Sequence, residues 1–258
     1  MNAFSIGIGG ITGWKVLQRI ETRQVEALAR EKAVQNSTTY FRDNLSADMT
    51  AEDLVGDYRM LSVALKAFGL ESDIGNKAFI RKVLESDLSD SKSLVNRLSD
   101  KRYLKFAEAF GLSSGKIDPE ALGKTISDSY VQREFESRVG AGDETMRLAM
   151  NARRELQAMA GRESSNNTLW YEVMGNTPLR KVFQTAFGFG DSFGQLPVER
   201  QLQEFTQAAE RRLGTGQLTE IATEEGIERL ITNYLARSQI TTSAAQNRYS
   251  AALTLLSR

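Results

Sequence analysis

The run Ala-Phe-Gly, followed each time by a large apolar residue, occurs three times, and each copy ends a segment with helical spacing. The copies occupy residues 67–70, 109–112 and 186–189. A glycine directly after a helix adopts the left-handed conformation that closes the last turn, and the next apolar residue folds back onto that turn. We therefore predict three helix stops, each with a phenylalanine packed where one helix gives way to the next. The residues concerned are Phe68, Gly69, Phe110, Gly111, Phe187 and Gly188.

The rest of the chain also predicts an all-α fold. Only three prolines occur in 258 residues, and no strict alternation of apolar and polar residues lasts for the length of a strand. The three copies are unevenly spaced, which excludes a regular solenoid. Because the surroundings of the first and third copies are alike, we expect an irregular multi-helix bundle with two related helical subdomains and amphipathic terminal helices.

The expected organisation has four parts. A glycine-rich leader and an amphipathic helix occupy residues 1–45, and a first helical subdomain occupies 46–161. After a polar stretch at 162–167 come a second subdomain at 168–240 and a C-terminal helix at 241–258. The expected helices are 14–43, 50–68, 75–86, 91–98, 100–110, 118–138, 143–159, 168–174, 178–187, 197–213, 218–237 and 242–257.

The composition removes the commonest catalytic and metal-binding side chains. The chain has no cysteine and no histidine, so it lacks thiolate nucleophiles, imidazole bases and Cys- or His-ligated zinc. Glu220 and Glu224 share a helix face, but a di-iron site also needs a Glu-x-x-His element. Asp87 and Asp90 do not have the spacing of a calcium loop. We therefore expect no enzyme activity, no cofactor and no metal ion.

The charge and hydropathy patterns narrow the choice of partners. Lysine plus arginine and aspartate plus glutamate number 33 each, which leaves no overall basic field for nucleic acid. No apolar run approaches the roughly 18 residues that membrane insertion requires. The N-terminus lacks the pattern of a Sec signal peptide. The expected location is therefore the cytoplasm, or outside it through export by a route that does not use such a signal.

A family resemblance appears in residues 57–112. It is carried by Asp-Tyr-Arg at 57–59, the first Ala-Phe-Gly-Leu, the segment 76–87, Leu-Ser-Asp-Lys-Arg-Tyr at 98–103 and the second Ala-Phe-Gly-Leu. Residues 179–190 and Gln201 support it. Over about 50–240 the chain resembles an uncharacterised family of helical proteins encoded among bacterial flagellar genes. This resemblance implies a role in flagellar assembly, structure or motility through protein partners, either flagellar components or further copies of the chain. It supplies no catalytic residues.

The terminal helices carry the candidate partner contacts. Apolar residues form a stripe near the N-terminus, and near the C-terminus they recur at intervals of four, three and four, as in a coiled-coil seam. The candidates are Trp14, Leu17, Val25, Leu28, Tyr249 and Leu256. Flagellar axial proteins have a similar plan. We favour the alternative in which both helices dock on the chain's own core, since two or three heptads are too few for a sustained coiled coil. A second functional hypothesis is a cytoplasmic adaptor or export chaperone that holds a partner helix in a groove.

Overall fold

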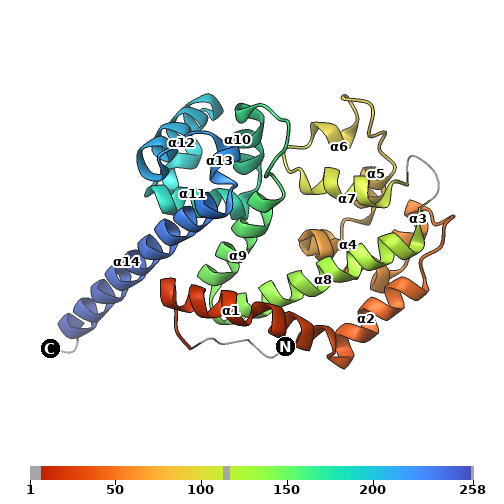
Figure 1. Ribbon diagram of the computed structural model, residues 1–258, viewed down its shortest axis with the longest axis horizontal. Coiled ribbons are helices and arrows are strands. Elements are labelled where there is room, and N and C mark those ends of the chain that lie inside the picture. The colour runs from red at the N-terminus through yellow and green to blue at the C-terminus, as the bar shows by residue number, and fades with distance from the viewer. Residues whose placement is uncertain (1–6, 113–116, 257–258) are drawn as a thin grey trace. The chain divides into compact units, whose positions relative to one another are not determined.

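The computed structural model confirms an all-α fold (Figure 1). It describes residues 7–112 and 117–256, and the side chains of residues 191 and 241–256 lie outside that description. Within the described ranges there are fourteen α-helices, two short 3-10 helices and no strand. The chain divides into two compact units. We call residues 19–138 the inner unit, and residues 1–18 together with 139–258 the terminal unit.

The inner unit is built around α4 (Tyr58–Phe68), whose buried residues include Leu61, Ala64 and Leu65. Helices α2, α3 and α7 pack against α4, and Phe106 and Phe110 of α7 extend the same hydrophobic core. The other elements of this unit are the second part of α1 (Gly10–Ala29), α2 (Lys32–Asp43), α3 (Ala51–Gly56), η1 (Glu71–Asp73), α5 (Lys77–Leu84), α6 (Leu94–Arg97), α7 (Arg102–Phe110) and most of α8 (Pro119–Gly142).

The terminal unit is centred on α11, which lies against both α9 and α14. Its core is aromatic: Trp170 meets Phe183 at 5.2 Å and stacks on Phe205 at 5.8 Å between ring centroids. Its elements are the start of α1, α9 (Glu144–Gln157), α10 (Asn166–Gly175), α11 (Thr177–Phe187), η2 (Asp191–Gln195), α12 (Val198–Leu213), α13 (Leu218–Ile221) and α14 (Glu224–Leu256). The helix α14 starts beside α11 to α13 and continues beyond them (Figure 1).

The three predicted helix stops are confirmed. Gly69, Gly111 and Gly188 follow α4, α7 and α11 in the left-handed conformation, with φ of 69°, 58° and 77°. At the first stop the amide of Leu70 donates to the carbonyl of Leu65 at 2.9 Å, the long hydrogen bond of a Schellman motif. There the amide of Gly69 also donates to the carbonyl of Lys66, and the third stop has the corresponding two bonds. The amide of Gly111 donates to the carbonyl of Ala107, the bond of an αL cap.

The phenylalanines of the stops are buried to different degrees. Phe110 and Phe187 are buried, as predicted. Phe68 is only half-buried, with its ring edge-on to Phe106 at 5.3 Å between centroids. The prediction of a buried aromatic is therefore confirmed at two of the three stops. It is wrong at the first stop, since Phe68 lies at the margin of the inner core.

Several helices begin or end elsewhere than the sequence indicated. The helix α1 begins at Gly10, inside the expected leader, and the expected helix 14–43 is interrupted at residues 30–31. The expected helix 50–68 is broken at Asp57, because the carboxylate of Asp57 accepts hydrogen bonds from the amides of Arg59 and Met60 and so caps α4. Conversely, α14 is continuous from 224 to 256, where the sequence indicated a break between residues 237 and 242; the hydroxyl of Ser238 donates to the carbonyl of Tyr234 within this helix.

The division between the units differs from the expected four parts. It falls inside two helices, at residues 18–19 in α1 and 138–139 in α8. The polar stretch 162–167 lies within the terminal unit, where the hydroxyl of Ser165 accepts a hydrogen bond from the amide of Thr168 and caps α10. The cluster of polar residues at 162–167 thus marks a helix start and not a boundary between units. The chain passes from one unit to the other within α1 and again within α8.

Candidate interaction site

Two of the predicted contact residues are packed within their own unit. Trp14 and Leu17 are 1% and 0% exposed. The indole Nε1 of Trp14 donates to the carboxylate of Glu228, at 3.0 Å from each oxygen, and the guanidinium of Arg153 lies 5.1 Å from its ring centroid. Gln18 donates to the same carboxylate at 2.9 Å. These contacts agree with the alternative in which the N-terminal helix docks on the chain's own core.

The remaining contact candidates are spread over the chain. Leu28 is buried and Val25 half-buried, and both belong to the inner unit, not the terminal unit of Trp14 and Leu17. Tyr249 and Leu256 lie on the helical backbone of α14, but their side chains lie outside the described residues. Four of the candidates are thus divided between the two units, and the side chains of the other two lie outside the described residues.

A groove in the terminal unit, which we call the α14 groove, is a better candidate. It has a volume of about 660 Å³ and is formed by α9, α11, α14 and the segment that follows Gly188. Ile240 at this groove is 69% exposed, so a large apolar side chain is available there for contact. The lining residues are Glu144, Thr145, Leu148, Lys181, Thr185, Gly188, Phe189, Gly190, Tyr234, Arg237, Ser238 and Ile240.

The third helix stop shapes this groove. A methyl group added at Gly188 would lie 2.4 Å from Nη1 of Arg237, so the glycine lets α14 bring its arginine against the end of α11. Nearby, burial raises the pKa of Tyr234 to about 12, so its hydroxyl stays protonated at physiological pH. The groove combines apolar surface with neutral hydroxyls and charges of both signs, which is typical of protein contacts.

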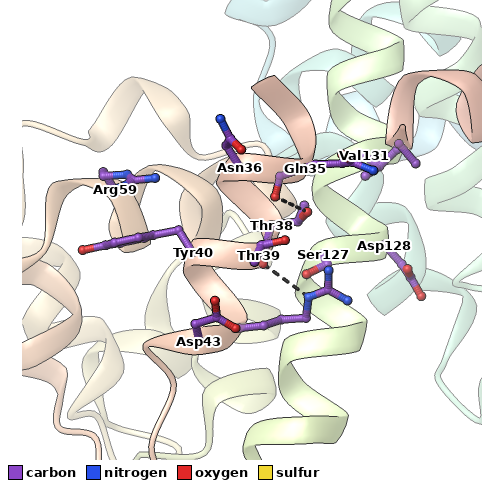
Figure 2. A pocket seen from close by; sticks show the side chains of 12 residues that line it. Gln35, Asn36, Thr38, Thr39, Tyr40, Asp43, Arg59, Ser127, Asp128 and Val131 are labelled. Atoms are coloured by element: carbon purple, nitrogen blue, oxygen red, sulfur yellow. Dashed lines mark hydrogen bonds between the residues drawn. The ribbon is translucent and has the colours of Figure 1, made fainter. Parts of the chain in front are cut away.

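A second groove, the α2 groove, lies in the inner unit and also has a volume of about 660 Å³. Figure 2 shows Tyr40 and Arg59 toward one end and Ser127 and Asp128 toward the other, with α2 between them. The hydroxyl oxygen of Ser127 is buried and makes no hydrogen bond within the described chain. The lining residues are Ala29, Gln35, Asn36, Thr38, Thr39, Tyr40, Arg42, Asp43, Arg59, Ser127, Asp128 and Val131.

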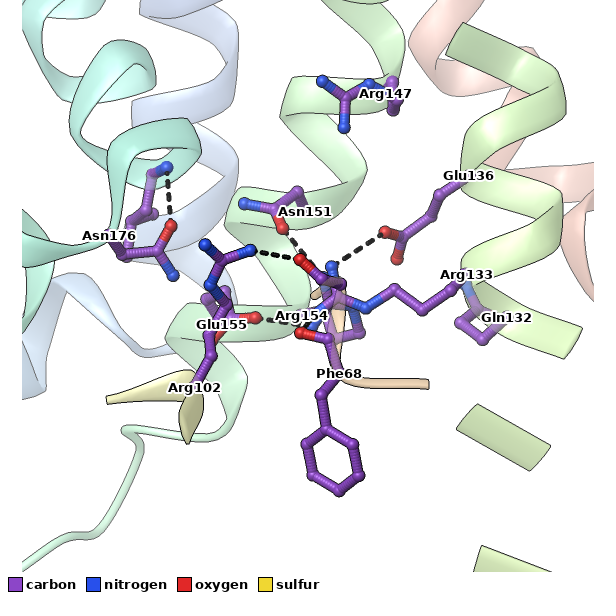
Figure 3. A network of polar contacts seen from close by, with 12 residues as sticks. Phe68, Arg102, Gln132, Arg133, Glu136, Arg147, Asn151, Arg154, Glu155 and Asn176 are labelled. Carbon is purple, nitrogen blue, oxygen red and sulfur yellow. Dashed lines mark hydrogen bonds and ion pairs between the residues drawn. The ribbon is translucent and has the colours of Figure 1, made fainter. Parts of the chain in front are cut away.

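Buried ionic groups in both units have partners and serve the fold. In the inner unit, Arg133 donates to the carbonyl of Phe68 at 3.2 Å and lies 3.8 Å from the carboxylate of Glu136 (Figure 3). In the terminal unit, Arg154 donates to Asn151 at 2.8 Å and to Glu155 at 2.6 Å. Among the described residues, no group of three or more acidic side chains is placed to hold a metal ion.

No pattern in the sequence indicates the residues that make these grooves. Arg59 and Tyr40 come from different helices, and Gly188, which follows α11, lies against Arg237 of α14. Hydrophobic periodicity identifies the buried face of each helix, but it does not pair surface residues across helices. Ile240 could have been identified as an apolar residue in a polar stretch, although its exposure depends on where the other helices of the terminal unit end.

None of the helices in residues 7–112 and 117–256 has the length and hydropathy of a membrane span.

Comparison with known proteins identifies a similar fold and the family. No curated protein matches the sequence. A crystal structure of a protein from Agrobacterium tumefaciens has the same fold, with a TM-score of 0.73 and 23% identity over 89% of this chain and 93% of that chain. The model of a family of unknown function, DUF1217, matches residues 67–227, more than half of the sequence, and the chain therefore belongs to that family.

Proposed function

We propose that this protein is a non-enzymatic helical component of the bacterial flagellar system that acts by protein–protein contacts in flagellar assembly, structure or motility. The observation that carries the proposal is the resemblance of residues 57–112 to helical proteins encoded among flagellar genes. In the structure this segment contains α4 to α7, which supply much of the inner core. The resemblance therefore covers a folded part of the molecule and is more than a short motif.

The α14 groove is the surface that we assign to partner contact. Its apolar residues include Phe189 and Ile240, and Ile240 is already 69% exposed on the described surface. Covering such a residue contributes binding energy through the apolar area removed from water, about 25 cal/mol per Å². The surrounding hydroxyls and charges then provide orientation and specificity.

Deletion of the gene in a motile host tests the flagellar role. We expect loss of swimming or of normal filaments, with recovery when the wild-type protein is supplied from a plasmid. Normal swimming together with normal filaments after deletion would contradict the proposal.

A matched pair of variants then tests the groove. Ile240→Glu places a charge in the α14 groove, whereas Val198→Glu changes another exposed β-branched residue of the same unit, 51% exposed and outside the groove lining. Both variants should keep the wild-type unfolding temperature. We expect Val198→Glu to restore swimming in the deletion strain and Ile240→Glu to fail. Equal rescue by the two variants would remove the groove from the proposal.

The alternative function is a cytoplasmic adaptor or export chaperone that binds a partner helix. The α14 groove supports it as well, because an open groove between helices suits an amphipathic helix. Cell fractionation separates the two functions. A secreted component appears in sheared filaments or culture supernatant only when the flagellar export apparatus works, whereas an adaptor stays in the cytosol in either strain.

A further inference from the structure

The C-terminal part of α14 continues beyond the packing of its own unit. In the first part of this helix one face is buried, with Ile231 and Leu235 both 0% exposed. Ile240, little more than one turn further on, is already 69% exposed. The helical backbone nevertheless runs unbroken to Leu256, beyond α11 to α13 (Figure 1). We call residues 241–256 the α14 extension.

The sequence of the α14 extension has few features that stabilise a helix standing alone in water. Arg248 is its one charged residue, so it cannot form the ion pairs between successive turns that support a solvated helix. Six of its 16 residues are Ser, Thr or Asn, which favour the helix less than Ala or Leu does. Isolated helices of this length are marginal, and most helices in proteins owe their stability to packing. A helix of this composition therefore indicates a packing partner.

The apolar seam of the α14 extension is symmetric about its own centre. It consists of Ala245, Tyr249, Ala252 and Leu256, at intervals of four, three and four. The first and last of these lie equally far from the peptide bond between residues 250 and 251, and so do the two middle ones. If two copies of this helix pair antiparallel about that point, a large residue of one copy faces an alanine of the other in all four layers. Facing large and small residues fill the space between two helices without voids.

The same seam does not suit a parallel pair. Each seam residue would then face its own counterpart, so a layer of two tyrosines would stand between layers of two alanines and leave voids beside it. A two-fold interface requires that residue i of one copy meets residue j of the other and that j meets i. The mirror order of large and small residues meets this requirement within a single sequence, which favours a second copy of this chain as the occupant.

We propose that two copies of this chain associate through the α14 extension, as an antiparallel helix pair centred between residues 250 and 251. Tyr249 of each copy then meets Ala252 of the other. Four layers bury less area than a standard stable interface does, so we expect a weak dimer that forms as the concentration rises. The pairing requires no flagellar role and does not involve the α14 groove, so the two proposals can fail separately.

Sedimentation velocity of the purified full-length protein tests the association. We expect a shift from monomer to dimer over an about hundredfold range of concentration that reaches ~200 µM. Ala252→Glu places a charge in the seam of both copies and should weaken the dimer at least about tenfold. Ala251→Glu is the matched control, because it makes the same change one residue earlier, outside the seam. It should dimerise as the wild type does, and both variants should keep the wild-type unfolding temperature.

Crosslinking through introduced cysteines tests the orientation, since the natural chain has no cysteine. Tyr249→Cys and Ala252→Cys proteins are mixed, oxidised and weighed by mass spectrometry. We expect the mixed disulfide to form in preference to either disulfide between like chains. A preference for like chains, a monomer at every concentration, or equal weakening by the two glutamate variants would overturn the proposal. So would a wild-type protein that forms a complex only with a different chain.

Discussion

The glycine at the end of α11 provides a quantitative test of the helix stop and its arginine. Gly188 has φ 77° and ψ 28°, a conformation that costs a residue with a Cβ about 1 kcal/mol. In Gly188→Ala the methyl group would also stand 2.4 Å from Nη1 and 3.1 Å from Cζ of Arg237. Both distances are shorter than a van der Waals contact, so the guanidinium must leave its position on the end of the helix.

The expected loss has two parts. Backbone strain contributes about 1 kcal/mol, and we expect moving the Arg237 guanidinium off the helix end to add about 1 kcal/mol, the size of a typical net polar interaction. Gly214→Ala is the matched control. Gly214 ends α12 with φ 80°, belongs to the same unit, and would bring a methyl group within 4 Å of no atom. We therefore expect about 2 kcal/mol of destabilisation for Gly188→Ala and about half of that for Gly214→Ala.

Urea unfolding followed by tryptophan fluorescence measures this difference. Trp14 and Trp170, the chain's two tryptophans, both belong to the terminal unit, so the signal reports the unit that is changed. In an Arg237→Ala background the cost of Gly188→Ala should fall to that of Gly214→Ala, because the clash has been removed. Equal costs of the two glycine substitutions in the wild-type background, or a cost of Gly188→Ala that is independent of Arg237, would refute the reasoning.

Two further substitutions test contacts to carboxylates, one in each unit. Trp14→Phe removes the donor to Glu228 and should lower the free energy of unfolding by about 1.5 kcal/mol, measured by urea unfolding followed by circular dichroism. Glu134→Gln should cost about 3 kcal/mol at neutral pH, because Lys66 and Arg138 lose the buried carboxylate that pairs with them. Burial alone would raise the pKa of Glu134, but hydrogen bonds from these two cations outweigh it and hold the pKa below its ordinary value of 4.5. The stabilisation is therefore present above pH 4.5 and is lost as the pH falls through the folded-state pKa, so the wild type should lose more stability than the variant in that acid range.

The elements that could be predicted from the sequence are those specified by neighbouring residues. The stops at Gly69 and Gly188 depend on the last turn of their own helix. The cap of α9 depends on Asp143, whose carboxylate accepts hydrogen bonds from the amides of Thr145 and Met146. The all-α class follows in the same way, from spacing within single segments. These signals can be read from the sequence because all the interacting groups lie within a few residues of the helix end.

Features that depend on distant residues could not be predicted. The break at Asp57 has a local cap, but the residue that shares its carboxylate, Tyr40, comes from another helix. The burial of Trp14 depends on Glu228 at the start of α14, far along the chain. An amphipathic stripe looks the same whether it covers the chain's own core or a partner, because periodicity reports only that one face is apolar. The candidate grooves depend on such cross-helix pairs throughout.

The geometry of the helix stops adds support for an internal duplication. In the inner unit, Arg133 of α8 lies on Gly69, where an added methyl group would come within 2.9 Å of its Nη1, and it donates to the carbonyl of Phe68. In the terminal unit, Arg237 of α14 occupies the corresponding place beside Gly188. Each unit thus closes a helix with a left-handed glycine and covers that glycine with an arginine from a long later helix. Because the two arginines follow their glycines at different separations, no sequence period can reveal the pairing, and the likeness between the units is carried by how the helices pack.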